Sequence, residues 1–415
     1  MHNACIKPGE FWLPNPTVDL TAWACVACDQ YTSQPAYWQE ADMLVGEKPS
    51  ALRLVLPELY LSDAAARIPM IQQTMQTYMQ NGTLIPRVRN GFVLVERMAG
   101  EGARLGLVAA LDLECYDYRP GTTLPVRATE GTILERIPPR MNIRRDAALE
   151  LSHVLLLVDD PMQSVLEPLF AKRTELEKLY DFPLMMGGGH LTGYAVTDEN
   201  DIQSVYAALD ALQMQNEILF AVGDGNHSLA TAKSCWEELK QTLPPEALQN
   251  HPARYAMVEI ENIHDDALIF EPIHRVLFGF DGDDLLGELE AYAVQKGWTL
   301  GAMDAAHDVA MVYEGKEVEL NIGESGEPLA VGALQTFLDE WMQGRPGLTL
   351  DYVHGEAAAR ELAAQPNTIA FLLPALHKSE LLPAVAQSGT LPRKTFSMGE
   401  AHEKRYYMEA RRIKP

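Results

Sequence analysis

The sequence is poor in cysteine and has no long apolar run. Its 415 residues include five cysteines, of which only Cys25 and Cys28 form a C-x-x-C pair. No second pair follows at the spacing of a zinc site, so we expect reduced, buried thiols. No stretch is long and apolar enough to predict a membrane span, and the N-terminus shows no charged leader before an apolar segment. We therefore expect a cytoplasmic protein without a membrane partner.

Basic residues are also scarce. Lysine and arginine number 33 against 58 aspartate and glutamate residues, which gives a formal net charge of −25. A field of this sign repels the phosphate backbone of nucleic acids, so no nucleic-acid partner is expected. A local basic pocket could still hold a small anion. The partners we expect are a small-molecule substrate and, as an open alternative, a second copy of the chain in a homodimer.

Several common catalytic motifs are absent as well. The chain has no G-x-G-x-x-G, G-x-x-x-x-G-K-[ST], G-x-S-x-G or H-E-x-x-H sequence and no EF-hand loop. Rossmann and Walker nucleotide sites, the hydrolase nucleophile elbow and the commonest metal sites are therefore excluded.

The length and the alternation of elements predict the fold class. Apolar residues make up 47% of the chain, and 415 residues exceed one comfortable core. A proline-rich polar stretch near residue 250 suggests a first domain over 1–250 and a second over 251–415. Strands and helices mix throughout, which predicts an α/β protein with mixed sheets. Expected elements include a hairpin of residues 91–97 and 105–113, a long loop over 119–139, and helices over 144–151 and 161–180.

One segment combines a strand, a glycine turn and a helix. Residues 217–222 form an apolar strand, and the residues that follow it are Gly223, Asp224, Gly225, Asn226, His227 and Ser228. Leu229, Ala232, Trp236 and Leu239 then recur at helical spacing. The first N–H groups of a helix have no intrahelical partner and carry partial positive charge, and glycines let a phosphate approach the backbone. Asp224 is a candidate ligand for a divalent cation, and His227 a phosphate donor or proton shuttle. The alternative is that Asp224 or Asn226 caps the helix and His227 lies at the surface.

This segment also carries a family resemblance. The run FAVGDGNHSLATAK (220–233) resembles the Asp-Gly-x-His-Arg turn and small-residue helix of the ParB/sulfiredoxin-like superfamily. It is most similar to DUF1015, a bacterial family known only as a domain of unknown function. Five further runs agree with that family: ACDQYTSQPAYWQEA (27–41), TEGTILERIPPRMNIR (129–144), DFPLMMGGGHLTGY (181–194), FEPIHRVLF (270–278) and LPRKTF (391–396).

The resemblance implies a ParB/sulfiredoxin-like first domain that binds a nucleoside tri- or diphosphate with Mg²⁺. In that superfamily ParB proteins use CTP, sulfiredoxin uses ATP, and archaeal free-serine kinases phosphorylate the amino acid. The function it implies is a nucleotide-dependent phosphotransferase that acts on a small hydroxyl metabolite, with free serine as the first candidate. Two alternatives remain open, a nucleotide-binding switch with little catalysis and a metal-dependent phosphate-ester hydrolase.

One departure from the family motif matters for this expectation. The arginine that usually follows the histidine is Ser228 here, which removes a cation that would neutralise phosphate charge. Either another arginine replaces it, or triphosphate binding is weakened or lost. The loop after residue 126 offers four candidate phosphate ligands, Arg127, Arg136, Arg140 and Arg144, and Glu130 is a candidate base. The alternative is a solvated, salt-bridged loop.

Three other groups are weaker candidates. Gly187, Gly188, Gly189 and His190 form either a second ligand-facing loop or a plain flexible turn. Lys394, in the basic run 393–395, could reach the site across a domain interface. The polar and aromatic residues Asp29, Tyr31 and Thr32 either bind ligand or pin the N-terminal arm.

Overall fold

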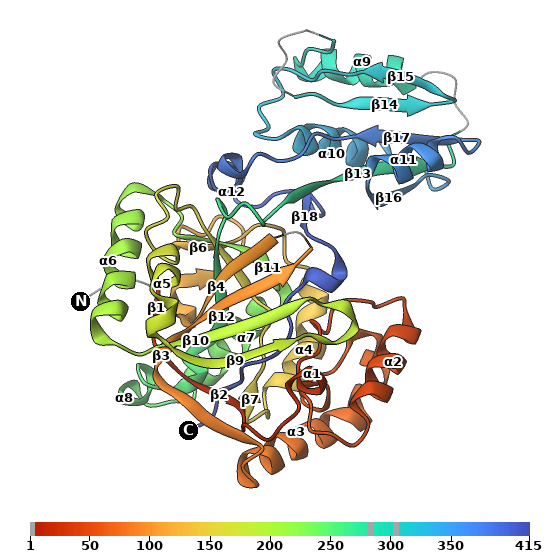
Figure 1. The fold of residues 1–415 in the computed structure, drawn as a ribbon. Coiled ribbons are helices and arrows are strands. Elements are labelled where there is room, and N and C mark those ends of the chain that lie inside the picture. Colours follow the sequence, from red (N-terminus) through yellow and green to blue (C-terminus); the bar gives the residue numbers. More distant parts are fainter. Residues whose placement is uncertain (1–4, 101, 281–284, 302–306) are drawn as a thin grey trace. The chain divides into compact units, whose positions relative to one another are not determined.

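A computed structural model describes residues 5–100, 102–280, 285–301 and 307–415. The chain divides into two compact units, one of residues 1–268 and 400–415 and one of residues 269–399. The predicted boundary at residue 250 thus falls inside the first unit, and the last sixteen residues return to it. Both units mix helices and strands (Figure 1), so the predicted α/β class is confirmed.

The first unit is built on one mixed sheet. Across the sheet its strands are β5 (Tyr116–Asp117), β6 (Val126–Ala128), β11 (Phe220–Asp224), β8 (Leu155–Val158), β12 (Tyr255–Asn262), β4 (Gly102–Asp112), β3 (Leu84–Ala99), β10 (His190–Val196) and β9 (Glu177–Pro183). Two short strands extend it, with β1 (Ile6–Lys7) on β4 and β2 (Gly9–Pro14) on β3. A separate ladder joins β7 (Leu149–Glu150) to β19 (Arg411–Arg412). The predicted hairpin is confirmed as β3 and β4, which pair antiparallel.

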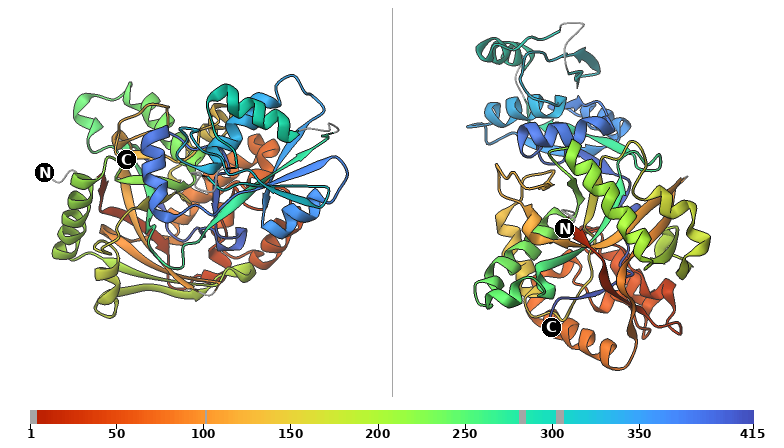
Figure 2. Two further views of the ribbon diagram at one scale, coloured as in Figure 1. Left: turned by 90° about the horizontal axis from the view of Figure 1, so that it is seen from above. Right: turned by 90° about the vertical axis from the view of Figure 1, so that its left-hand side faces the viewer.

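Helices cover both faces of this sheet (Figures 1 and 2). They are α1 (Leu20–Trp23), α2 (Pro35–Val45), α3 (Ala64–Gln80), α4 (Ile137–Arg144), α5 (Glu167–Ala171), α6 (Glu199–Gln215), α7 (Asn226–Lys240) and α8 (Pro245–Leu248). Because side chains alternate along a strand, β3 contributes residues to two hydrophobic cores, one on each face of the sheet. Val93 and Val95 join a core that includes Trp23 and Trp38, whereas Phe92 and Leu94 join one that includes residues of α5, α6 and α7.

Two helix predictions in this unit are wrong. Residues 161–180 form the short α5, a 3-10 turn over Arg173–Glu175 and then the start of β9. Strand β9 pairs with β10 and buries Tyr180 and Phe182 at the two-residue spacing of a strand. Residues 144–151 are not a helix either, since α4 ends at Arg144. Its first turn contains Pro138 and Pro139, where the sequence predicts the end of a loop. Proline is tolerated there because first-turn N–H groups need no intrahelical partner.

The second unit has a smaller sheet and its own core. The sheet order is β15 (Lys316–Glu319), β14 (Ala310–Tyr313), β17 (Thr368–Leu372), β13 (Phe270–Phe278) and β16 (Thr349–His354), with β18 (Phe396–Met398) paired to the start of β13. Its helices are α9 (Leu285–Lys296), α10 (Ala330–Trp341), α11 (Glu356–Ala363) and α12 (Leu381–Ser388). The α11 side of the sheet packs Ala359 and Ala363 against Val276 and Ala370.

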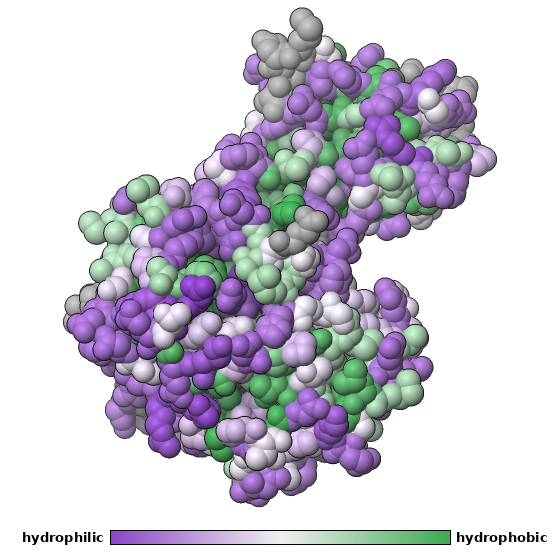
Figure 3. Space-filling model, viewed as in Figure 1, coloured by the Kyte–Doolittle hydropathy of each residue, from purple (hydrophilic) through white to green (hydrophobic). Residues whose placement is uncertain are grey.

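The surface agrees with the acidic composition. Hydrophilic side chains cover most of what Figure 3 shows of either unit. Within the described ranges, no helix has both the length and the apolar character needed to cross a membrane.

Candidate functional site

The strand–glycine–helix junction forms as the sequence predicted. Strand β11 ends at Asp224, Gly225 adopts a left-handed φ of 77°, and α7 starts at Asn226. A Cβ on Gly225 would lie 2.9 Å from the Cα of Val154, so both the backbone angle and the available space require glycine. The Gly225 N–H donates to Oδ1 of Asp224 at 2.8 Å. No side chain among the described residues caps the helix, so the expectation that Asp224 or Asn226 does so is not met.

Lys404 comes to this turn from the C-terminal segment. Its Nζ lies 3.4 Å from Oδ2 of Asp224, and both side chains are largely buried. The turn therefore presents a carboxylate and an ammonium group side by side at the start of a fifteen-residue helix.

A buried charged histidine lies behind Ser228. Nε2 of His153 is 3.4 Å from both Oγ of Ser228 and Oδ2 of Asp29, and its Nδ1 is 2.7 Å from the Tyr407 hydroxyl. Burial alone would lower the pKa of His153, but the Asp29 carboxylate outweighs it and holds that pKa well above 6.5. The imidazolium thus places a positive charge next to Ser228.

His227, in contrast, is neutral. Burial, then Arg136 and Arg140, lower its pKa to about 4. Its Nε2 accepts the backbone N–H of Ile133 at 3.2 Å, so the ring proton of the neutral form lies on Nδ1. His227 can therefore donate one hydrogen bond through Nδ1 to an anion at the turn.

We expect an NMR titration of the His227 ring to give a midpoint near pH 4. Because the pKa in the folded protein is below the ordinary 6.5, protonation favours the unfolded chain. Stability should be complete above pH 6.5 and fall as the pH drops toward 4, by less than the full pKa shift implies, because the ring is only partly buried and solvent screens its charge. His227→Gln should remove this part of the pH dependence of unfolding. A His227 ring that titrates at 6.5 or higher would contradict the described environment.

Two of the four predicted arginines lie near this site. Arg136 is exposed at the end of a short turn, and Arg140 follows on α4, which packs against α7 through Ile137, Met141 and Ala230. Both are close enough to lower the pKa of His227. Arg140 is paired with Glu58 and also donates to the carbonyl of Arg136 at 2.7 Å.

The other two arginines have structural partners. Arg127, on β6, donates to Glu217 at 2.6 Å and to the carbonyl of Leu124 at 3.1 Å. Arg144 is paired with the buried Glu150 at 2.6 Å. The structure therefore gives Arg136 and Arg140 a place at the site and engages Arg127 and Arg144 in ion pairs elsewhere.

The remaining predicted residues are placed as follows. Strands β6 and β11 are parallel, so Glu130, just beyond β6, lies at the same sheet edge as Asp224. Thr129 strengthens this junction by donating to the carbonyl of Val222 at 2.7 Å. His190, on β10, has its Nε2 2.6 Å from Asp181 of the adjacent β9, so the structure gives it a partner away from the turn. Lys394 belongs to the second unit, and its role at the turn stays a prediction.

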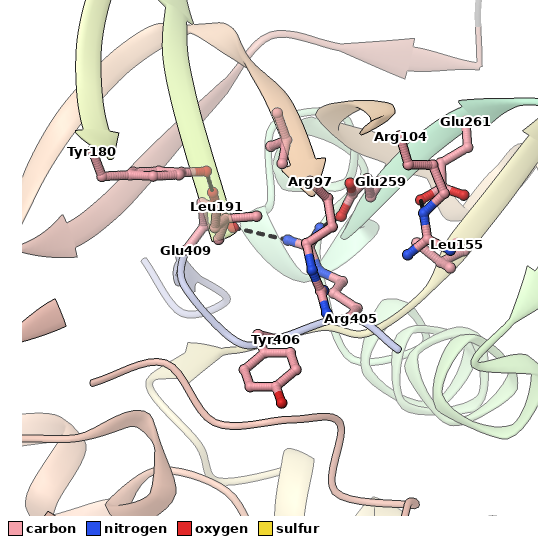
Figure 4. Close-up of a pocket in the computed structure, with 11 residues that line it drawn as sticks. Arg97, Arg104, Leu155, Tyr180, Leu191, Glu259, Glu261, Arg405, Tyr406 and Glu409 are labelled. Carbon is pink, nitrogen blue, oxygen red and sulfur yellow. Dashed lines mark hydrogen bonds and ion pairs between the residues drawn. The ribbon is translucent and has the colours of Figure 1, made fainter. Parts of the chain in front are cut away.

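Buried arginines hold the segment that carries Lys404. Arg97 donates to the carbonyls of His402, Lys404 and Gly188 at 3.0, 3.0 and 2.8 Å, and Arg104 to that of Glu403 at 2.9 Å. Figure 4 shows the pocket that these arginines line together with Arg405, Glu259, Glu261 and Tyr406. A Cβ on Gly188 would lie 2.4 Å from the Tyr406 ring, so this glycine of the triple-glycine loop packs against the C-terminal segment rather than facing a ligand.

Three residues near the turn are not predicted from the sequence: Lys404, His153 and Tyr407. They lie far from the turn along the chain, and no local pattern marks them. For Asp29 the sequence predicts either ligand binding or attachment of the N-terminal arm. Its contact with His153 ties the N-terminal segment to the turn.

Comparison with known proteins gives a family but no activity. Solved structures similar to this chain include a free serine kinase mutant in complex with ADP (13% identity, 70% of this chain and 90% of that chain covered, TM-score 0.39) and C-terminally truncated SbnI from Staphylococcus aureus (9%, 70% and 82%, 0.36). A conserved hypothetical protein from Pyrococcus furiosus is also similar (12%, 70% and 93%, 0.34). No curated protein matches the chain. The model of the family DUF1015, "Protein of unknown function", matches residues 6–341, and the chain therefore belongs to DUF1015, as its sequence predicted.

Proposed function

We propose that the Asp224 turn binds the phosphates of a nucleoside tri- or diphosphate and that the protein transfers a phosphoryl group to a small hydroxyl metabolite, with free serine as the first candidate. The observation that carries this proposal is the set of cations around a helix N-terminus without a side-chain cap. Lys404, the charged His153, Arg136 and Arg140 all surround the start of α7 in a chain of net charge −25. Helix N–H groups and cations together favour a bound phosphate.

The cations at the site can exchange their carboxylate partners for a phosphate. Lys404, His153 and Arg140 are paired with Asp224, Asp29 and Glu58, respectively. Arg136 is exposed and has no ion pair with any described residue. A phosphate that binds Arg136 and Lys404 releases Asp224 from its ion pair. The Asp224 carboxylate then becomes available for catalysis.

Each residue of the turn has a role in this scheme. The backbone N–H groups of Asn226, His227 and Ser228 hold phosphate oxygens, and Nδ1–H of His227 donates to one of them. The acceptor hydroxyl oxygen bonds to the terminal phosphorus as the bond to the leaving phosphate breaks, and Asp224 or Glu130 takes the hydroxyl proton.

A single carboxylate at the turn is compatible with Mg²⁺. Within the described ranges, no three His, Cys, Asp or Glu side chains gather as a metal-binding group. Mg²⁺ in phosphoryl-transfer sites commonly needs only one or two carboxylates, because substrate phosphates and water supply the other ligands. Asp224 would hold the ion once Lys404 has moved to phosphate, and the ion would supply charge neutralisation on the transferring group.

The same contacts favour a second candidate, a nucleotide-binding switch. Asp29 of the N-terminal segment and Lys404 and Tyr407 of the C-terminal segment all contact the turn or His153. A ligand that takes Lys404 away from Asp224 would therefore act on both ends of the first unit without any chemistry.

Nucleotide binding and turnover test these proposals. We would measure dissociation constants for ATP, ADP, CTP, GTP and tripolyphosphate with and without Mg²⁺, and then product formation with free serine. Lys404→Met should weaken nucleotide binding by roughly 10- to 150-fold, the value of a hydrogen bond to a charged group. Lys414→Met is the matched control, because Lys414 pairs with the exposed Asp146 at 3.7 Å.

The outcomes separate the candidate functions. Binding with phosphorylated acceptor supports the phosphotransferase, and binding without turnover supports the switch. Release of phosphate without any acceptor supports the hydrolase alternative. If none of the five ligands binds, or if Lys404→Met binds them as the wild type does, the phosphate site is wrong.

A further inference from the structure

Three aromatic side chains between residues 31 and 38, just after Asp29 in the sequence, form a stack. The rings of Tyr31 and Tyr37 stack with their centroids 3.7 Å apart and their planes 11° apart. Tyr37 in turn meets Trp38 edge-on at 5.4 Å. Trp38 is 1% exposed and belongs to the core of the first unit, so the stack has a rigid base.

Tyr31 has an unusual backbone for a large side chain. Its φ is +53°, in the left-handed region that L-residues with bulky side chains seldom adopt. Such angles persist where the surrounding structure enforces them, and they are concentrated at binding and active sites. Tyr31 is partly exposed, and Tyr37 covers one face of its ring. The accessible part of the Tyr31 side chain is therefore not the ring face that Tyr37 covers.

The stack lies close to the phosphate turn. Tyr31 follows Asp29 by two residues, at most ~7 Å of chain. Asp29 contacts His153 behind Ser228, and its charge also acts on His227. On the other side, burial and then Glu400 of the C-terminal segment raise the pKa of Tyr31. The segment that carries Lys404 is thus adjacent to the aromatic stack as well.

We propose that Tyr31, supported by Tyr37, is the stacking platform for the base of a nucleotide whose phosphates lie at the Asp224 turn. This inference rests on the proposed nucleotide binding and assigns the base to a surface that the phosphate site does not include. Stacking on an aromatic ring is tolerant of base identity, because every base has a π face. The contact with Tyr31 should therefore increase the binding affinity of ATP, GTP and CTP by similar factors.

The test compares a ligand with a base to one without. Tyr31→Gly removes the ring, and glycine accepts a φ of +53° without strain, so the backbone can keep its conformation at this position. We expect Tyr31→Gly to weaken Mg²⁺–ATP binding by roughly 5- to 150-fold, the effect of losing one base stack, and to leave Mg²⁺–tripolyphosphate binding within about twofold. Tyr31→Phe should bind both ligands as the wild type does. Tyr206→Ala, which removes a partly buried ring that packs edge-on against Phe92 of the same unit, is the control for nonspecific loss of packing.

Other outcomes overturn the proposal in distinguishable ways. If Tyr31→Gly weakens ATP and tripolyphosphate equally, the ring only supports the fold of the site. If the wild type binds tripolyphosphate as tightly as ATP, the base makes no contact and the platform is wrong, although the phosphate site stands. If neither ligand binds the wild type, both the proposed phosphate site and the proposed stacking platform are wrong.

Discussion

Replacing Arg405 by methionine is expected to lower the free energy of unfolding by about 3–5 kcal/mol, the cost of leaving a buried charge without its partner. The Arg405 side chain is 5% exposed and pairs with Glu259 and Glu409, whose side chains are 7% and 2% exposed. Its Nε also donates to the carbonyl of Ser152 at 2.8 Å. Methionine fills a similar volume but provides no charge, so two carboxylates would remain in the core without this counter-ion.

Urea unfolding measures this effect, and Arg412→Met is the matched control. Arg412 lies in the same C-terminal segment but is exposed, and its guanidinium donates to the carbonyl of Pro415. Its replacement should change the free energy by no more than about 0.5 kcal/mol. Equal stability of the two variants would show that the arginine–glutamate cluster of Figure 4 is not assembled in the folded protein.

The sequence predicted the turn well because its signals are local. An apolar strand, two glycines and a helical apolar stripe follow one another within 23 residues, from 217 to 239. The steric and conformational reasons for Gly225, its approach to Val154 and its left-handed φ, appear only in the fold. The structure therefore confirms the junction, whereas the ligand and the reaction stay proposals.

Local sequence signals did not predict features that depend on contacts between distant parts of the chain. Residues 161–180 contain enough helix-favouring residues to suggest one long helix, but the pairing of β9 with β10 makes residues 177–183 a strand. Likewise, nothing in the composition of an acidic chain indicates that Arg97, Arg275, Arg405 and Arg411 are buried. Buried arginines need specific carbonyl and carboxylate partners, and those partners come from distant parts of the chain.

The cations next to Ser228 and Asp224 illustrate the same limit. From the sequence, Ser228 predicts that either another arginine substitutes or triphosphate binding is weakened or lost. The structure instead places a buried imidazolium, His153, 3.4 Å from the Ser228 hydroxyl, and Lys404 at Asp224. His153 has its raised pKa only because Asp29, from another segment, lies beside it. A charge that depends on two separate segments cannot be deduced from either of them alone.

The termini of the first unit thus converge on one helix end. Asp29 comes from the N-terminal segment, and Lys404 and Tyr407 come from the last sixteen residues. Three buried arginines fix the backbone around Lys404, since Arg97, Arg104 and Arg405 each donate to carbonyls of this segment or of its neighbour Ser152. This degree of support is what a site needs to hold charged groups in one geometry.

Asp224→Asn separates binding from chemistry at this site. Asparagine keeps the Oδ1 atom that accepts the Gly225 N–H at 2.8 Å, so the turn should retain its shape. It removes the negative charge next to Lys404, which leaves that ammonium group available to phosphate. Nucleotide affinity should therefore stay within about tenfold of the wild-type value or increase, because a cation near a phosphate strengthens binding.

Turnover of the Asp224→Asn variant should fall by about 10²- to 10⁴-fold, the usual contribution of a positioned base. Asp146→Asn is the control, because Asp146 also pairs with a lysine of the C-terminal segment but is 72% exposed and lies outside the site. Single-turnover phosphorylation of the acceptor and calorimetric binding of ATP, measured on both variants, give the two quantities separately. Retained turnover in Asp224→Asn would transfer the role of base to Glu130, whereas a parallel loss of binding and turnover would mean that Asp224 only shapes the turn. Lost turnover with retained or tighter binding is the result that a carboxylate released by phosphate requires.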